Sequence, residues 1–215
     1  MAELANKEKS GARQGPKPRL GEPLDNDRLD CELKNLLAQA GIYRKSDAYW
    51  KRIMKIVDGG ADVNAQSRTD HSTALDVASM VGKLEVCKFL MEKGANIDSR
   101  DGLGETPLMH AAHCGKHEIC VLLVENGADV NATNNGGCTA LMYAAKANDI
   151  AGCKVLLEKG ACAWTKNVGG STALDFAKHS NSMDAYYFLE EWELGKIMGK
   201  AAKGFVAAFR DCVKG

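Results

Sequence analysis

Histidine and cysteine, the side chains that most often bind zinc, gather within eleven residues near the middle of the chain. This group consists of His110, His113, Cys114, His117 and Cys120. His110 and Cys114 are four residues apart, which places them on one face of a helix. These side chains could therefore bind a zinc ion together. In the competing interpretation, they do not converge, because His110 and Cys120 point into a stack of helices while His113 and Cys114 face solvent or a partner. We favour this second interpretation and expect neither a metal nor another cofactor.

Other patterns of catalytic residues are missing from the sequence. A phosphate-binding loop needs Ser or Thr after its Gly-Lys pair, and none of the Gly-Lys pairs at Gly82, Gly115, Gly195 and Gly199 has one. No Gly-x-Ser-x-Gly nucleophile turn occurs either. The sequence therefore predicts a protein that is not an enzyme.

A repeat of about 33 residues organises the chain. A Gly-Ala pair recurs at residues 60, 94, 127 and 160, and a threonine recurs every 33 residues at 73, 106, 139 and 172. Within one period, Thr106 and Pro107 are typical of the start of a helix, and Gly115 separates this short helix from a second one. Neither helix could bury its apolar face alone, so we expect stacked helical units with a continuous core.

These motifs resemble those of the ankyrin repeat family. The segments TPLMHAA (106–112) and GADVNA (127–132) match the family pattern in order and spacing, and GADVNA recurs at 60–65. The family often has histidine where Asp76, Met109, Met142 and Asp175 stand, which predicts weaker turn chemistry there. The resemblance implies an all-α ankyrin repeat solenoid, in which helix-turn-helix units stack with projecting turns.

The repeats and their flanks predict three regions. Residues 1–24 are rich in Lys, Gly, Pro and Glu and should form a disordered tail. Residues 25–193 should form the repeat domain, with units at about 25–66, 67–100, 101–133, 134–166 and 167–193. The first unit diverges, with a helix expected at 32–41 and about seven inserted residues around 42–48. Residues 194–215 should form a basic amphipathic helix.

The charges and cysteines narrow the class of protein further. Lys plus Arg and Asp plus Glu both number 28, so the formal net charge is zero and nothing favours nucleic acid. Eight cysteines in 215 residues are too few for a disulfide scaffold. Without a secretory signal or an 18-residue apolar run, we expect a cytoplasmic chain, and we expect a monomer.

The resemblance also implies that turn tips and first helices form a concave face that binds a partner protein. The family's recognition positions lie in the turn, just after the Ala pair and at the end of the repeat. In this sequence they are Asp70, Ser72, Met80, Val81, Arg100, Leu103, Glu105, His113, Cys114, Thr133, Asn135, Cys138, Lys146, Ala147, Lys166, Val168, Ser171, His179 and Ser180. Apolar groups surrounded by charges are typical of a protein interface. We therefore expect a non-catalytic adaptor or scaffold.

The C-terminal segment keeps an alternative open. Its candidate binding residues are Lys196, Lys200, Lys203, Phe205, Phe209 and Arg210. Such a helix could cap the last repeat, enter a calmodulin-like groove, or lie on an anionic membrane surface. In the second and third cases the tail, and not the repeat stack, would carry the function. A structural subunit of a larger assembly is a further possibility.

Overall fold

The computed structural model describes residues 26–38 and 46–198, and all its regular elements in these ranges are helices. They are α1 (Asn26–Ala38), α3 (Asp47–Asp58), α4 (Ala74–Val81), α5 (Leu84–Glu92), α6 (Pro107–His113), α7 (His117–Glu125), α8 (Ala140–Lys146), α9 (Ile150–Glu158), α10 (Ala173–His179) and α11 (Met183–Met198). The predicted all-α class is confirmed.

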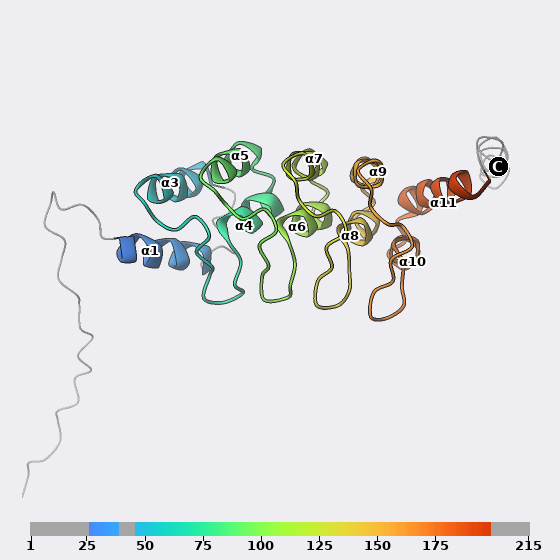
Figure 1. The fold of residues 1–215 in the computed structure, drawn as a ribbon, viewed down its shortest axis with the longest axis horizontal. Coiled ribbons are helices and arrows are strands. Elements are labelled where there is room, and N and C mark those ends of the chain that lie inside the picture. Colours follow the sequence, from blue (N-terminus) through green and yellow to red (C-terminus); the bar gives the residue numbers. More distant parts are fainter. Residues whose placement is uncertain (1–25, 39–45, 199–215) are drawn as a thin grey trace, which may run out of the picture.

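The helices form paired units that stack along one axis, as the repeat predicts (Figure 1). Helices α4, α6, α8 and α10 pack side by side as first helices, and each also packs on the second helix of its own unit. Loops between successive units project beyond the first helices (Figure 1). This arrangement is the predicted solenoid. No described helix combines the length and hydrophobicity that crossing a bilayer requires.

The helices at the two ends of the stack have other bounds than the sequence predicts. Helix α1 begins at Asn26, six residues before the expected start at Glu32. Helix α11 runs without a break from Met183 to Met198, so the predicted boundary between residues 193 and 194 falls inside one helix. The predicted tail at 1–24 and residues 199–215 of the predicted basic helix lie outside the described residues, as do residues 39–45 of the divergent first unit.

The repeated threonines begin the first helices of the last four units. Thr106 accepts a hydrogen bond from the Met109 backbone N–H, and Pro107 follows at the first turn, as predicted. Thr73 and Asp76 exchange bonds in a reciprocal capping box, and Thr172 and Asp175 do the same. The expectation of weaker turn chemistry is therefore wrong at both aspartates, because each aspartate caps its helix in another way.

Two of these threonines allow a matched test of capping. Thr73 and Thr139 are equally buried, at 3% exposure, but Thr139 Oγ1 has no hydrogen-bond partner among the described residues. We expect Thr73→Val to lower the free energy of unfolding by about 1–2 kcal/mol, because valine keeps the shape but loses the cap. Thr139→Val should be neutral or stabilising, since it removes an unpaired buried hydroxyl. Urea unfolding followed by circular dichroism measures both, and equal losses would contradict the assignment.

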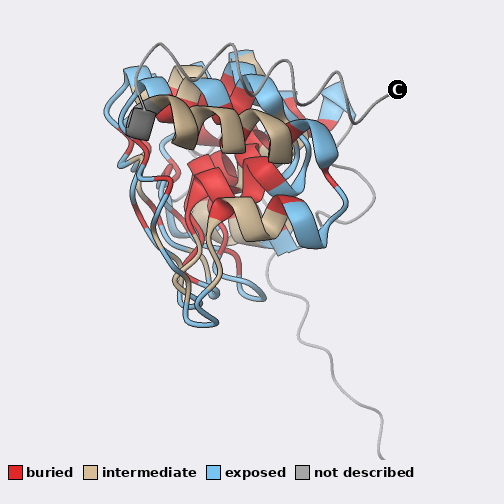
Figure 2. Ribbon diagram, turned by 90° about the vertical axis from the view of Figure 1, so that its right-hand side faces the viewer, coloured by how far each residue is buried: buried red, intermediate tan, exposed pale blue. Residues whose placement is uncertain are grey.

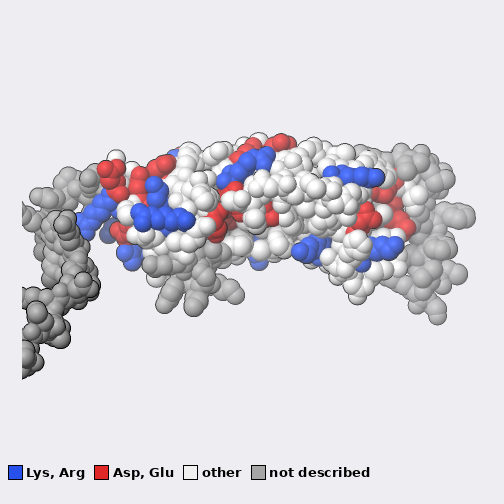
Figure 3. All heavy atoms as spheres, turned by 90° about the horizontal axis from the view of Figure 1, so that it is seen from below, with Lys and Arg blue, Asp and Glu red and all other residues white. Residues whose placement is uncertain are grey.

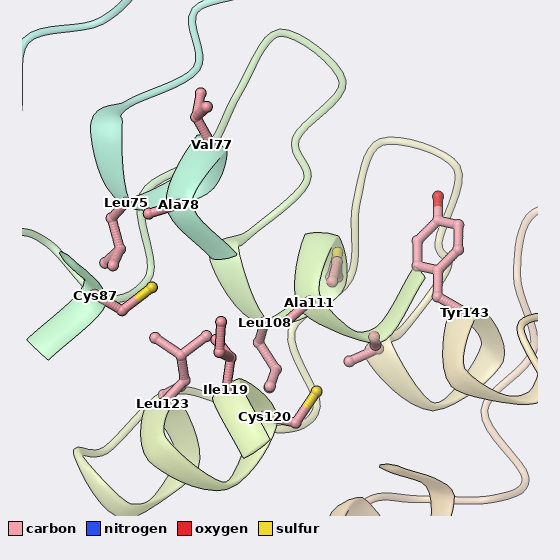
Figure 4. Close-up of a cluster of buried hydrophobic side chains, with 14 of the residues drawn as sticks. Leu75, Val77, Ala78, Cys87, Leu108, Ala111, Ile119, Cys120, Leu123 and Tyr143 are labelled. Carbon is pink, nitrogen blue, oxygen red and sulfur yellow. The ribbon is translucent and has the colours of Figure 1, made fainter. Parts of the chain in front are cut away.

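The core lies between the two layers of helices (Figure 2). Leu108 of α6 and the α7 residues Ile119, Cys120 and Leu123 are each at most 2% exposed and point into one cluster (Figure 4). Ala111 and Ala112 are fully buried, and their small side chains let neighbouring first helices approach closely. These residues form the part of the expected continuous core that lies in the third unit.

Backbone hydrogen bonds also join successive projecting loops. Gly102 N donates to Asp70 O at 2.8 Å, and the equivalent bonds Asn135 N to Leu103 O and Val168 N to Gly136 O are 3.0 Å long. At the base of the loops, the side-chain oxygens of Asn64, Asp98 and Asn131 each accept a backbone N–H from the next unit, at 2.7–3.0 Å. These contacts hold the loops in register.

Candidate partner-binding face

The predicted binding residues lie on the first helices α4, α6, α8 and α10 and on the projecting loops, which together we call the inner face. Those exposed to solvent are Asp70, Arg100, Leu103, His113, Cys114, Thr133, Asn135, Lys146, Ala147, Lys166, Val168, His179 and Ser180, while Met80, Val81, Cys138 and Ser171 are half-buried. Leu103 and Val168 are large apolar side chains with exposures of 65% and 83%. The side chains of the predicted tail-binding residues lie outside the described part of the chain.

Ser72 and Glu105 are corrections to this set, because both are buried. The Ser72 hydroxyl donates to Asp70 Oδ1 at 2.8 Å, and Glu105 Oε1 accepts bonds from Asn134 and from the Tyr143 hydroxyl. Both residues directly precede the threonine that caps a first helix, at the point where the loop returns to the stack. They shape the loop base and do not present a surface to a partner.

Some exposed candidates also hold the loops together. The Arg100 guanidinium donates to Gly104 O at 3.2 Å and to Thr133 O at 2.7 Å, so it joins two units. Asn135 Nδ2 donates to Gly102 O at 3.4 Å. Reversing the charge of Arg100 would therefore disturb the stack as well as the surface. The cleaner position for testing charge is Lys146, whose side chain forms no hydrogen bond or ion pair among the described residues; its backbone carbonyl accepts a bond from the Ser182 hydroxyl at 2.9 Å.

Beneath the inner face, a polar cluster links the second, third and fourth units. His110 lies between two carboxylates, with Nε2 at 3.2 Å from Asp101 Oδ2 and Nδ1 at 3.7 Å from Glu105 Oε2. Glu105 in turn binds Tyr143, and burial together with this contact raises the pKa of Tyr143. The neighbouring Asp76 is 1% exposed, and burial raises its pKa to about 6.

The structure separates most of the histidines and cysteines that were considered as zinc ligands. Cys120 is buried in the core of α7, where burial raises the pKa of its thiol to about 12 and keeps it protonated, whereas His113 and Cys114 are exposed. Among the described residues, the one group of potential ligand atoms within 4.8 Å of one another is Asp101, Glu105 and His110.

The polar atoms of Asp101, Glu105 and His110 already have partners within the protein. Asp101 Oδ1 accepts backbone N–H groups of Leu103 and Glu105 at 2.9 and 2.8 Å, and the remaining oxygens of both carboxylates face the His110 ring. The Asp101–His110–Glu105 arrangement serves as a link between loop and helix.

The sequence interpretation missed the partners of His110 and His113. His113 stacks on Tyr143 with ring centroids 4.9 Å apart, and burial and the nearby Lys146 lower its pKa. His110 and Tyr143 each stand four residues after a capping threonine, at the same position of consecutive units. Both side chains contact Glu105. Their shared position was the available signal, because each repeat packs on its neighbours in the stack.

Comparison with known proteins agrees with this architecture. The family model "Ankyrin repeats (3 copies)" matches residues 45–134 and 98–167, which together are more than half of the chain. The chain therefore belongs to the ankyrin repeat family. Ankyrin repeats are in general protein–protein interaction modules and typically not catalytic.

Curated relatives share part of the repeat region. The chain is 38% identical over 100 residues to the human Arf-GAP with coiled-coil, ANK repeat and PH domain-containing protein 2, a match that covers 43% of this chain and 12% of that protein. The protein of the same name from Rattus norvegicus is 40% identical over 82 residues, covering 36% of this chain and 10% of the relative. The chain thus spans only about a tenth of the length of these relatives. The activity that their name gives belongs to those proteins.

Proposed function

We propose that this chain is a non-catalytic adaptor that binds a partner protein through its inner face, in the cytoplasm and as a monomer. One observation carries the proposal: the inner face exposes Leu103 and Val168 on loops whose backbones are held in register. Burying exposed apolar groups is the main favourable term in association, and a rigid surface loses little conformational entropy when it binds.

The surroundings of these two side chains support the same function. Much of the surface on the side of the loop tips carries neither Lys or Arg nor Asp or Glu (Figure 3). Exposed charged residues of the inner face, such as Asp70, Arg100 and Lys146, accompany the apolar residues. Apolar groups surrounded by polar and charged ones are the usual composition of a protein interface.

The test is affinity capture of partners from a lysate of the source cells with the full chain and with its Leu103→Ser/Val168→Ser variant. We expect the variant to lose at least about nine-tenths of the captured partner, since buried apolar residues near the centre of an interface dominate affinity. Ile150→Ser is the control, because Ile150 is also exposed, at 41%, but lies on the second helix α9. Equal capture by all three proteins would place the interface elsewhere.

A further inference from the structure

The first helices of the third, fourth and fifth units carry a basic residue at the same position. His113, Lys146 and His179 each stand seven residues after the capping threonine, and all three are exposed. We call these three residues the basic row. In the second unit this position is occupied by Met80, so the row belongs to the C-terminal part of the inner face.

Carboxylates on the same segments are turned inward. Residues 101–113, 134–147 and 167–180 contain three acidic residues, Asp101, Glu105 and Asp175. Asp101 and Glu105 are engaged with backbone N–H groups, His110 and Tyr143 as described above. Asp175 Oδ2 accepts from both the backbone N–H and the hydroxyl of Thr172, each at 2.8 Å. This part of the inner face therefore exposes a lysine flanked by two histidines, while its carboxylates are engaged in hydrogen bonds within the protein.

No residue of the basic row forms an ion pair with a carboxylate among residues 26–38 and 46–198. Two lysines of the second unit differ, because Lys88 on α5 pairs with Glu85 at 2.9 Å and Lys93, directly after α5, pairs with Asp58 at 2.7 Å. Burial and the nearby Lys146 lower the pKa of His113, and the Glu105 carboxylate offsets this effect only in part. An anion between His113 and Lys146 would relieve the repulsion between them.

We propose that the basic row binds an extended acidic segment of the partner protein, an inference that rests on the proposed function of the inner face. Packed helices lie about 8–10 Å apart, and an extended chain advances about 3.3 Å per residue. Carboxylates roughly three residues apart would therefore meet successive members of the row. In this arrangement, one Asp or Glu side chain lies beside Lys146, and the next acidic side chain in each direction lies beside His113 or His179.

A fluorescein-labelled nonapeptide of three Glu-Gly-Ser triplets is the probe, and its counterpart with Gln in place of Glu is the uncharged control. Binding to the full chain is measured by fluorescence anisotropy at about 20 mM salt, where exposed charges are weakly screened. We expect the Glu peptide to bind at least about tenfold more tightly than the Gln peptide, and Lys146→Glu to weaken that binding by at least about tenfold.

Lys154→Glu is the matched control, because it makes the same change in net charge in the same unit but lies on the second helix α9. We expect it to change the affinity by less than about twofold, since Lys154 is remote from the row. Absence of Glu-peptide binding, or equal losses in Lys146→Glu and Lys154→Glu, would overturn the proposal. Tighter binding of a nine-nucleotide oligothymidylate with the same dependence on Lys146 would also overturn it, in favour of a nucleic-acid backbone.

Failure here is distinguishable from failure of the proposed function. Partner capture that depends on Leu103 and Val168 but is accompanied by no Glu-peptide binding would leave the inner face as the interface and remove only its acidic ligand. Capture that does not depend on these residues would count against the proposed function itself.

Discussion

Replacing Leu123 with alanine should lower the free energy of unfolding by about 2–5 kcal/mol. Leu123 is 0% exposed and contributes to the cluster between α6 and α7 (Figure 4). Removing its isobutyl group leaves a cavity that the closely packed neighbours Leu108 and Ile119 cannot fill completely. Because each unit is stabilised only by its own core and its neighbours, we expect the loss in the third unit to weaken the whole stack.

Leu122→Ala is the control for this prediction. Leu122 belongs to the same helix but is only half-buried, so its truncation should cost less than half as much. Urea denaturation followed by circular dichroism at 222 nm gives both values. A loss below about 1 kcal/mol for Leu123→Ala would show that the core between α6 and α7 is not packed as described.

The fold was predictable from the sequence because the same pattern of residues recurs in several units. Each repeated threonine stands at the start of a first helix, and four such positions in phase leave little freedom for the helices between them. The burial of Glu105 was not predictable in this way. It depends on a bond to Tyr143, which is 38 residues away in the sequence, and no local pattern contains that contact.

The aspartate at position 76 should make the stability depend on pH in an unusual direction. Burial raises the pKa of Asp76 from 3.8 to about 6 in the folded state, so the folded protein holds this proton more tightly than the unfolded chain. Its contribution favours folding below about pH 4 and is lost as the pH rises through 6. The total change is about 3 kcal/mol, of which about 2 kcal/mol falls between pH 4.5 and 7.

Asp76→Asn removes this titration. We expect the stability of Asp76→Asn relative to the wild type to rise by about 2 kcal/mol between pH 4.5 and 7, as measured by urea unfolding at both pH values. Asp175→Asn is the control, because Asp175 forms the same kind of capping box but hydrogen bonds from Thr172 lower its pKa. Its relative stability should not rise over this interval, and an identical response of the two variants would contradict the assignment to Asp76.

The position of a candidate residue within its repeat predicts its exposure in some cases and not in others. Positions at the C-terminal end of the first helix, such as Lys146 and Ala147, are exposed, because they lie on the side away from the core. The last loop residue varies between units, because Ser72 and Glu105 are buried whereas Cys138 and Ser171 at the same position are half-buried. Burial at this position depends on the partner that each side chain finds, which is Asp70 for Ser72 and Tyr143 for Glu105.

Binding of the partner on the inner face is most directly tested by photo-cross-linking. A photoreactive amino acid is placed in the full chain at Ala147, at the end of first helix α8, or at Ala151, on second helix α9, and both positions are exposed. After irradiation in source-cell lysate, we expect a specific cross-linked protein from position 147 and none from position 151. Cross-linking of the same protein from position 151 alone would contradict recognition through the inner face.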